Sequence, residues 1–257
     1  MSGEQLIYGN WIRKRILWRL GAGVLISGTI ACLPVHPYLR GVAVILSVVL
    51  GVSLLFPLYA YYAFSPRGGN LQERFYDLVI DKLGDRTPKE ILDIGTGNGV
   101  LAVKLAVRYP QSQVTGVDYW GDDWEYAQAV CDENARRAKV AGSVRFIRGD
   151  AAALDYQDCT FDVVVSNLTF HEVDTAPDKR SVVAEALRML KPGGAFVFVD
   201  TFYQSKIYGP VDDFEDYVRS LVDRGAALRP IREGVPYSKL LEHPRVLGKV
   251  GLLNGTK

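Results

Sequence analysis

The segment Leu92-Asp93-Ile94-Gly95-Thr96-Gly97-Asn98-Gly99 decides the fold of this chain. It leaves a short apolar run and enters an apolar helical pattern over 101–107. Glycines between a strand and a helix allow a tight turn, and they let backbone N–H groups approach a ligand at the helix N-terminus. Dinucleotide-binding proteins have a similar turn, so the glycines alone do not identify the ligand. The acid before the first glycine, Asp93, favours a cationic ammonium group, because a carboxylate there would repel a pyrophosphate.

Strand and helix patterns alternate around this turn. Apolar runs predict strands at 91–94, 113–117, 144–148, 161–166 and 195–199, and helical patterns cover 101–107, 123–139, 177–190 and 212–224. This alternation predicts an α/β fold with a Rossmann-like, doubly wound, mainly parallel sheet. Beyond residue 225 the pattern is weaker, and only 250–253 is expected as a final strand.

Polar side chains follow three further strands of the expected sheet. Asp118 ends the second strand, Asp150 follows the third, and Asn167 follows the fourth. Ligands of open α/β sheets bind outside the carboxyl ends of the strands, so these side chains are expected at one site. An acid at the end of the second strand can accept both hydrogen bonds of a ribose diol. The carboxylate of Asp150 can accept a hydrogen bond from an adenine amino group.

Residues 91–200 resemble a class I S-adenosylmethionine-dependent methyltransferase. Within that family, the motifs are similar to those of small-molecule and quinone methyltransferases. The matching segments are Leu92–Gly99, Gly116-Val117-Asp118, Gly149-Asp150-Ala151, Phe161–Asn167 and Leu187-Arg188-Met189-Leu190-Lys191-Pro192-Gly193-Gly194. The resemblance implies a seven-stranded, mainly parallel sheet and S-adenosyl-L-methionine as the cofactor. It implies these cofactor-binding residues: Asp93, Gly95, Gly97, Asn98, Asp118, Tyr119, Asp150, Ala151 and Asn167. Two alternative roles stay open. Asp93 can form hydrogen bonds with amides of the glycine loop instead of the ligand, and Trp120 can anchor the loop.

Methyl transfer is a displacement at a sulfonium carbon, which needs alignment and a low-dielectric site. A base is required only if the acceptor must lose a proton. His171 and Glu172 are the catalytic candidates, because histidine titrates near neutrality. The alternative is that His171 packs under the following loop. Tyr203 and Tyr208, just after the fifth strand, are candidates for lining the acceptor pocket.

The pattern of residues 16–64 predicts a transmembrane helical hairpin. An uncharged run of 23 residues extends from Val42 to Phe64, and such a helix is about 34 Å long, enough to cross a hydrocarbon core of about 30 Å. A shorter uncharged run over 20–35 precedes it. Two alternatives are a cleaved signal peptide and a pair of buried core helices.

Charge around the hairpin predicts its orientation. Basic residues precede the first span (Arg13, Lys14, Arg15 and Arg19), Arg67 follows the second, and only Arg40 lies between the spans. The positive-inside rule then places both termini in the cytoplasm and makes the chain an integral membrane protein with the lipid bilayer as a partner. The expected ranges are a basic cytoplasmic N-terminus (1–15), the hairpin (16–64), a linker with an amphipathic helix (65–89) and a methyltransferase domain (90–257).

Composition excludes some classes of ligand. The 257 residues include 30 basic and 29 acidic side chains, a net charge of +1, which lacks the basic footprint of a nucleic-acid-binding protein. The three cysteines and three histidines are scattered, so no metal site is expected. The sequence leaves the oligomeric state open.

These features together predict a membrane-anchored methyltransferase. Its acceptor is expected to be a hydrophobic or membrane-associated small molecule, of the lipid or quinone type, at the cytoplasmic face. Two alternatives are a methyltransferase of a membrane-protein side chain and a non-catalytic scaffold that binds the cofactor.

Overall fold

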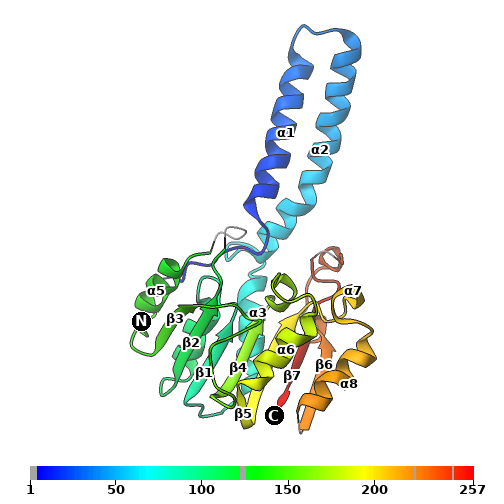
Figure 1. Cartoon of the computed structure of the whole chain (residues 1–257). Helices are drawn as coiled ribbons and strands as arrows, with labels where there is room; N and C mark the ends of the chain where they lie inside the picture. The colour runs from blue at the N-terminus through cyan, green and yellow to red at the C-terminus, as the bar shows by residue number, and fades with distance from the viewer. Residues whose placement is uncertain (1–4, 122–125, 223, 245) are drawn as a thin grey trace. The chain divides into compact units, whose positions relative to one another are not determined.

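The computed structural model of the chain describes residues 5–121, 126–222, 224–244 and 246–257. The chain divides into two compact units, Asn10–Glu73 and Met1–Gly9 with Arg74–Lys257. The first unit contains two long apolar helices, and the second contains the α/β sheet (Figure 1). The N-terminal residues through Gly9 therefore belong with the sheet, although the hairpin separates them from it in the sequence.

The helical unit is an antiparallel hairpin of α1 (Lys14–Cys32) and α2 (Pro37–Phe64). Small residues lie where the two helices meet, with Ser27 and Ala43 both buried. The Ser47 hydroxyl donates across the interface to the backbone oxygen of Val24 at 3.4 Å. Small side chains allow close approach of two helix backbones, which is how helices pack in lipid.

The other faces of the hairpin are apolar and exposed. Val42, Ile45 and Val52 are among its exposed side chains. Only 6% of the most apolar window of each helix is buried within the structure, and both helices are long and apolar enough to cross a membrane by length and composition. Such exposure does not fit the alternative of two buried core helices, whose apolar residues would be covered by protein.

The second unit is built on a seven-stranded sheet in the order β3-β2-β1-β4-β5-β7-β6. Its strands are β1 (Glu90–Ile94), β2 (Gln113–Asp118), β3 (Val144–Arg148), β4 (Phe161–Asn167), β5 (Leu190–Asp200), β6 (Arg224–Pro230) and β7 (Gly251–Thr256). The first five are parallel to one another, and β7 runs antiparallel to both of its neighbours, β5 and β6. The doubly wound, mainly parallel sheet predicted from the sequence is confirmed.

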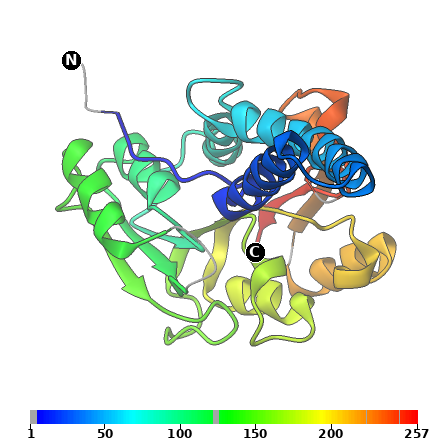
Figure 2. The same cartoon turned by 90° about the horizontal axis from the view of Figure 1, so that it is seen from above.

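Helices cover both faces of this sheet, with α3, α4 and α5 on one side and α6 and α8 on the other (Figure 2). Their bounds are α3 (Leu71–Leu83), α4 (Val100–Arg108), α5 (Gln128–Arg137), α6 (Lys179–Arg188), α7 (Ser205–Tyr208) and α8 (Val211–Leu221), with short 3-10 turns at 170–172, 231–233 and 239–241. Because both faces are covered, the central strands are apolar throughout instead of alternating. The main core contains Phe161, Phe196, Phe198, Phe202 and Phe214.

The observed elements differ from the expected ranges at a few places. The helix expected over 123–139 is observed as α5 from Gln128 to Arg137, and residues 122–125 of that range lie outside the described residues. The strand β5 begins at Leu190, five residues before the predicted 195. The strand β6 lies in the region beyond 225 for which only 250–253 was expected as a strand.

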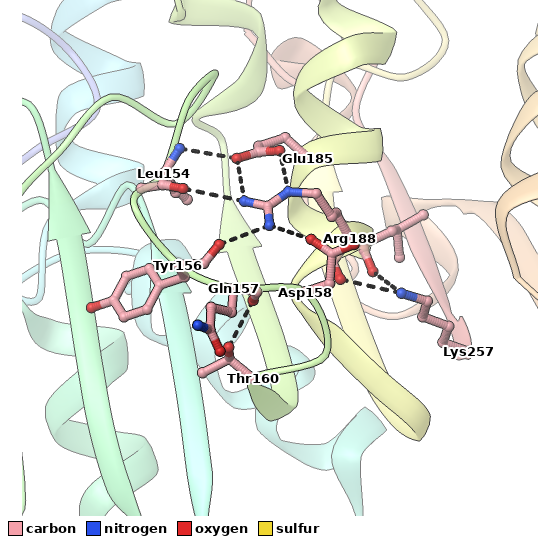
Figure 3. A network of polar contacts seen from close by, with 9 residues as sticks. Leu154, Tyr156, Gln157, Asp158, Thr160, Glu185, Arg188 and Lys257 are labelled. Carbon is pink, nitrogen blue, oxygen red and sulfur yellow. Dashed lines mark hydrogen bonds and ion pairs between the residues drawn. The ribbon is translucent and has the colours of Figure 1, made fainter.

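One polar cluster ties the loop between β3 and β4 to the end of α6 (Figure 3). Arg188 donates to both carboxylate oxygens of Glu185, at 2.8 and 2.9 Å, and to the backbone oxygens of Leu154 and Tyr156, at 3.2 and 2.7 Å. The amine of Lys257 donates to the Arg188 backbone oxygen at 3.2 Å. The cluster gives the last turn of α6 the partners that its carbonyl groups lack within the helix.

Candidate active site

The glycine loop after β1 adopts a conformation that only glycine accepts easily. Gly95 has φ +74° and Gly97 has φ +58°, both in the left-handed region. A Cβ atom on Gly95 would lie 1.8 Å from the Thr169 hydroxyl oxygen. The loop therefore passes so close to the chain after β4 that no side chain fits at this position.

Donors from outside the loop take up its carbonyl groups. The Trp120 indole N–H donates to the Gly97 backbone oxygen at 2.9 Å, and the Cys131 thiol lies 3.2 Å from the same oxygen. In a trans peptide the following N–H points the opposite way, so the amide of Asn98 faces away from these donors. Trp120 thus anchors the loop, the role that the sequence analysis left open for it.

Asp93 is fully buried at the end of β1, where its carboxylate accepts a hydrogen bond from the Thr96 hydroxyl at 2.7 Å. Burial, with the nearby charge of Asp118, raises the pKa of Asp93 to about 7 despite that hydrogen bond. Asp93 therefore holds the loop through the Thr96 hydroxyl, and its contact with the cofactor stays a prediction. A cation placed beside it would favour its ionised form.

Asp118 ends β2 beside the glycine loop. Its two oxygens accept hydrogen bonds from the Gly97 and Trp120 backbone N–H groups, at 2.8 and 2.9 Å. A carboxylate has room for further donors after these two, as a ribose diol would require. The next residue, Tyr119, is exposed, and the Arg148 guanidinium lies 4.9 Å from the centre of its ring.

The expected residues after β3 and β4 lie at the same edge of the sheet. One oxygen of Asp150 accepts hydrogen bonds from the Ala152 amide and the Thr175 hydroxyl, both at 2.9 Å, and Ala151 packs against the core. Asn167 ends β4, and its side-chain oxygen is buried with no hydrogen-bond partner among the described residues. A buried acceptor without a partner is costly, so a donor from a ligand would satisfy it.

His171 lies in the short turn after β4 and pairs with Asp200, the last residue of β5. Its Nδ1 atom lies 2.8 Å from Asp200 Oδ1, and Asp200 is fully buried. Burial alone would raise the pKa of Asp200 and lower that of His171, but their mutual attraction reverses both effects. The pKa of His171 is therefore above its ordinary value and that of Asp200 is below it.

Of the two predicted catalytic residues, Glu172 is the more exposed and has the looser contact. Its nearest carboxylate oxygen is 3.6 Å from His171 Nε2, and its side chain is 41% exposed. The pairing of His171 with Asp200 was missed in the sequence, although Asp200 ends a strand just as Asp118 does. The Thr201 amide also donates to Asp200, at 2.6 Å, so the carboxylate is fixed from two sides.

Tyr208 is fully buried, and its ring packs 5.1 Å from those of Phe202 and Phe214. It therefore belongs to the core and is not an open wall of an acceptor pocket. Burial and the charge of Asp200 raise the pKa of Tyr208 well above its ordinary value.

The chemistry of the site suits S-adenosyl-L-methionine. Asp118 suits a diol, and the unpaired oxygen of Asn167 suits an ammonium or hydroxyl donor. Within the described ranges, no group of three or more histidine, cysteine and acidic side chains is gathered that could hold a metal ion.

Comparison with known proteins gives the same answer. A family model described as "Methyltransferase domain" matches residues 91–194. An arsenite methyltransferase of Aquipseudomonas alcaligenes is 38% identical over 122 residues, which cover 46% of this chain and 34% of that protein. A ubiquinone/menaquinone biosynthesis C-methyltransferase of Desulfotalea psychrophila is 34% identical over 129 residues, which cover 50% of this chain and 48% of that protein. The chain thus spans less than half the length of either relative.

A solved structure shares the fold. An O-methyltransferase family protein from Burkholderia thailandensis superposes with a TM-score of 0.54 at 15% identity, over 95% of this chain and 70% of that one. The matched sequence segment contains the glycine loop, Asp118, Asp150 and Asn167. Residues 91–194 therefore match the methyltransferase domain family, and the fold of the catalytic unit is that of a solved methyltransferase structure.

Proposed function

We propose that this chain is a membrane-anchored methyltransferase that modifies a hydrophobic or membrane-associated small molecule, of the lipid or quinone type, at the cytoplasmic face of a membrane. The observation that carries the proposal is the exposed apolar surface of α1 and α2 in one chain with a methyltransferase domain. Exposed apolar surface of this extent is unfavourable in water and favourable in lipid. An anchor of this kind raises the concentration of the enzyme beside a substrate dissolved in the membrane.

The relatives support a small-molecule acceptor. One of them acts, by its name, in the biosynthesis of ubiquinone and menaquinone, and these molecules are hydrophobic. The acidic balance of the chain outside its basic N-terminal region makes a polyanionic acceptor unfavourable. We place the acceptor near the ends of β4 and β5, beside Asn167 and His171.

The bound cofactor supplies an electrophilic methyl group on a sulfonium. The residues of the chain would orient the reactants and exclude water: the glycine loop and Asp118 would hold the ribose and methionine parts, and the buried oxygen of Asn167 would accept a hydrogen bond from the ligand. The carboxylate of Asp200 holds a proton on His171 Nδ1, which leaves Nε2 available to accept a proton from the acceptor. Asp200 is in this mechanism a positioning residue, and His171 is the base.

Labelling of membranes tests the proposal. Membranes that contain the full chain are incubated with methyl-labelled S-adenosyl-L-methionine and then extracted with organic solvent. We expect the label in an extractable small molecule, and we expect no label with Asp118→Ala, which should lose about 2–4 kcal/mol of cofactor affinity with two charged hydrogen bonds. Label in protein would support the protein-methyltransferase alternative, and cofactor binding without transfer would support the scaffold.

The proposed orientation can be tested with the cysteines of the chain. Cys159 is exposed in the catalytic unit, and Tyr38 is exposed near the start of α2. In a Cys32→Ser background, a membrane-impermeant maleimide applied to intact cells should label Tyr38→Cys and leave Cys159 unlabelled until the cells are opened. Labelling of Cys159 in intact cells would show that the catalytic unit lies on the outer side of the membrane, opposite to the proposed orientation.

A further inference from the structure

The N-terminal residues 5–9 lie along α5 in the catalytic unit and form hydrogen bonds with it. The Ile7 N–H donates to Asn134 Oδ1 at 2.7 Å, and the Ile7 backbone oxygen accepts from Asn134 Nδ2 at 3.0 Å. The Gln5 backbone oxygen accepts from the Arg137 guanidinium at 2.9 Å. We refer to residues 5–9 as the N-terminal strap. The strap is therefore fixed to α5 through both backbone groups of one residue.

The same Asn134 side chain also holds the cofactor loop. Its Nδ2 group donates a second hydrogen bond, at 2.8 Å, to the backbone oxygen of Asn98. Asn134 is fully buried, so its bond to the Asn98 oxygen forms without competition from water. One amide group thus joins the strap to the loop that precedes α4, and both of its N–H bonds are used.

A second connection runs through the ring of Tyr126. A Cβ atom built on Gly9 would lie 2.2 Å from Cε1 on one edge of this ring. A Cβ atom built on Gly97 would lie 3.6 Å from Cδ2 and Cε2 on the opposite edge. The ring therefore lies between the end of the strap and the cofactor loop, with one edge toward each.

We propose that the N-terminal strap increases the affinity of the cofactor site for its ligand, and that Asn134 is the positioning residue that couples the strap to the cofactor loop. The Asn134 bond holds the Asn98 carbonyl and the Tyr126 ring lies beside Gly97, so the strap stabilises this one arrangement of Gly97 and Asn98. A loop that holds its binding conformation for only part of the time binds with an affinity reduced by that fraction. Coupling is reciprocal, so bound cofactor must stabilise the docked strap by the same factor. This inference concerns cofactor binding and is independent of the acceptor.

Cofactor binding by strap variants tests this inference. The full chain in detergent is compared with a deletion of residues 2–9, which removes the strap, and with a deletion of residues 2–4, which removes none of these contacts. We expect the dissociation constant of S-adenosyl-L-methionine to rise about tenfold with the longer deletion and to stay within twofold with the shorter one. Asn134→Leu should behave like the longer deletion, and Arg136→Ala, on the same helix, should behave like the full chain.

Hydrogen exchange separates this role from a purely structural one, and it needs no variant. Saturation of the full chain with S-adenosyl-L-methionine should slow exchange of the Ile7 amide about tenfold. If the strap only adds stability, its deletion should lower the melting temperature and leave the dissociation constant of S-adenosyl-L-methionine at 15 °C unchanged. The exchange rate of the Ile7 amide should then be the same with and without cofactor. That combination of results would overturn the inference.

Discussion

At the scale of single residues, the buried carboxyl of Asp93 should make stability depend on pH. Its pKa is raised from 3.8 to about 7, mainly by burial, so the folded state holds this proton more tightly than the unfolded state does. Its contribution to stability is complete below about pH 4 and is lost as the pH rises through 7. We expect Asp93→Asn to remove this loss, so that between pH 4 and 8 the variant gains up to about 4 kcal/mol of unfolding free energy relative to the unmodified chain.

Denaturant unfolding at several pH values measures this difference. Asp155→Asn is a suitable control, because Asp155 is an exposed acid and its replacement should leave the pH dependence unchanged. Parallel curves for the unmodified chain and Asp93→Asn would show that Asp93 does not titrate in this range.

The pair of His171 and Asp200 should determine how the methyl-transfer rate depends on pH. Asp200 holds the pKa of His171 above 6.5 against the effect of burial, so the rate should rise with pH through a value above 6.5 as Nε2 loses its proton. Asp200→Asn removes the attraction between the two side chains and leaves the effect of burial, which lowers the pKa of His171. The rising limb of the pH–rate profile should therefore move to lower pH, and the maximal rate should fall by about tenfold or more. A pH–rate profile of kcat measures both changes.

Glu172→Gln is the matched variant for this profile. Because Glu172 is partly exposed and its carboxylate is 3.6 Å from His171, its replacement should move the limb less than Asp200→Asn does. The reverse order would assign the positioning role to Glu172.

The same pair shows what sequence reasoning can find at this scale. The position of His171 after the fourth strand made it a candidate, and its sequence neighbour Glu172 was predicted as its companion. Its partner is 29 residues away, and the sheet explains why: β4 and β5 are adjacent, with Asn167 opposite Val199. An acid at the end of a strand is a visible signal, but which two strands are neighbours is a property of the fold.

At the scale of elements, the strands β1 to β4 were located to within one or two residues from their apolar runs. The strand β5 begins five residues before its predicted start, and β6 was missed. The sequence of β6, Arg-Gly-Ala-Ala-Leu-Arg-Pro, has little β-propensity and no clear alternation. Its ladder with β7 shifts register between Arg224 and Ala227. Pairing with β7 makes this segment a strand, and pairing over such a distance is not encoded in a local pattern.

The polar cluster at the end of α6 should be a strong stabilising element (Figure 3). Arg188→Met keeps most of the apolar stem and removes the bonds to Glu185, Asp158, Leu154 and Tyr156. Two backbone oxygens and two carboxylates lose a charged donor, so we expect a loss of about 2–3 kcal/mol in unfolding free energy.

Arg180→Met on the same helix is the control for this prediction. Arg180 pairs with Asp178 at the surface, where an ion pair contributes about 0–1 kcal/mol. Thermal unfolding of the two variants compares the losses, and equal shifts in melting temperature would mean that the cluster of Arg188 adds no more than a surface pair.

At the scale of the whole molecule, the ranges predicted from the sequence and the units of the structure divide the chain differently. Charge and hydropathy group residues 1–15 as one basic segment, whereas Gln5 and Ile7 form hydrogen bonds with the catalytic unit. Periodicity could not reveal this, because the strap forms no helix or strand and is held through its backbone. A simple N-terminal truncation would therefore remove the strap together with the hairpin.

A variant that separates these parts tests whether the hairpin delivers the acceptor. Residues 10–69 are replaced by a Gly/Ser linker of about 20 residues, which spans roughly 25 Å on average, and residues 1–9 are kept. Cofactor affinity should stay within about threefold, because the strap, the glycine loop and Asp118 are all retained. Turnover of a short-chain, water-soluble quinone should also be kept, since such an acceptor reaches the site through water.

Turnover of a long-chain quinone in vesicles should fall by about a hundredfold in the same variant, because the effective concentration of an enzyme held at the membrane is lost. The measurement is the ratio of kcat/KM for the two acceptors, which cancels any general damage to the catalytic unit. A hairpin that only locates the protein within the cell would leave this ratio unchanged in the purified system. An equal loss on both acceptors would instead place residues 10–69 among the parts that the catalytic unit needs for its own structure.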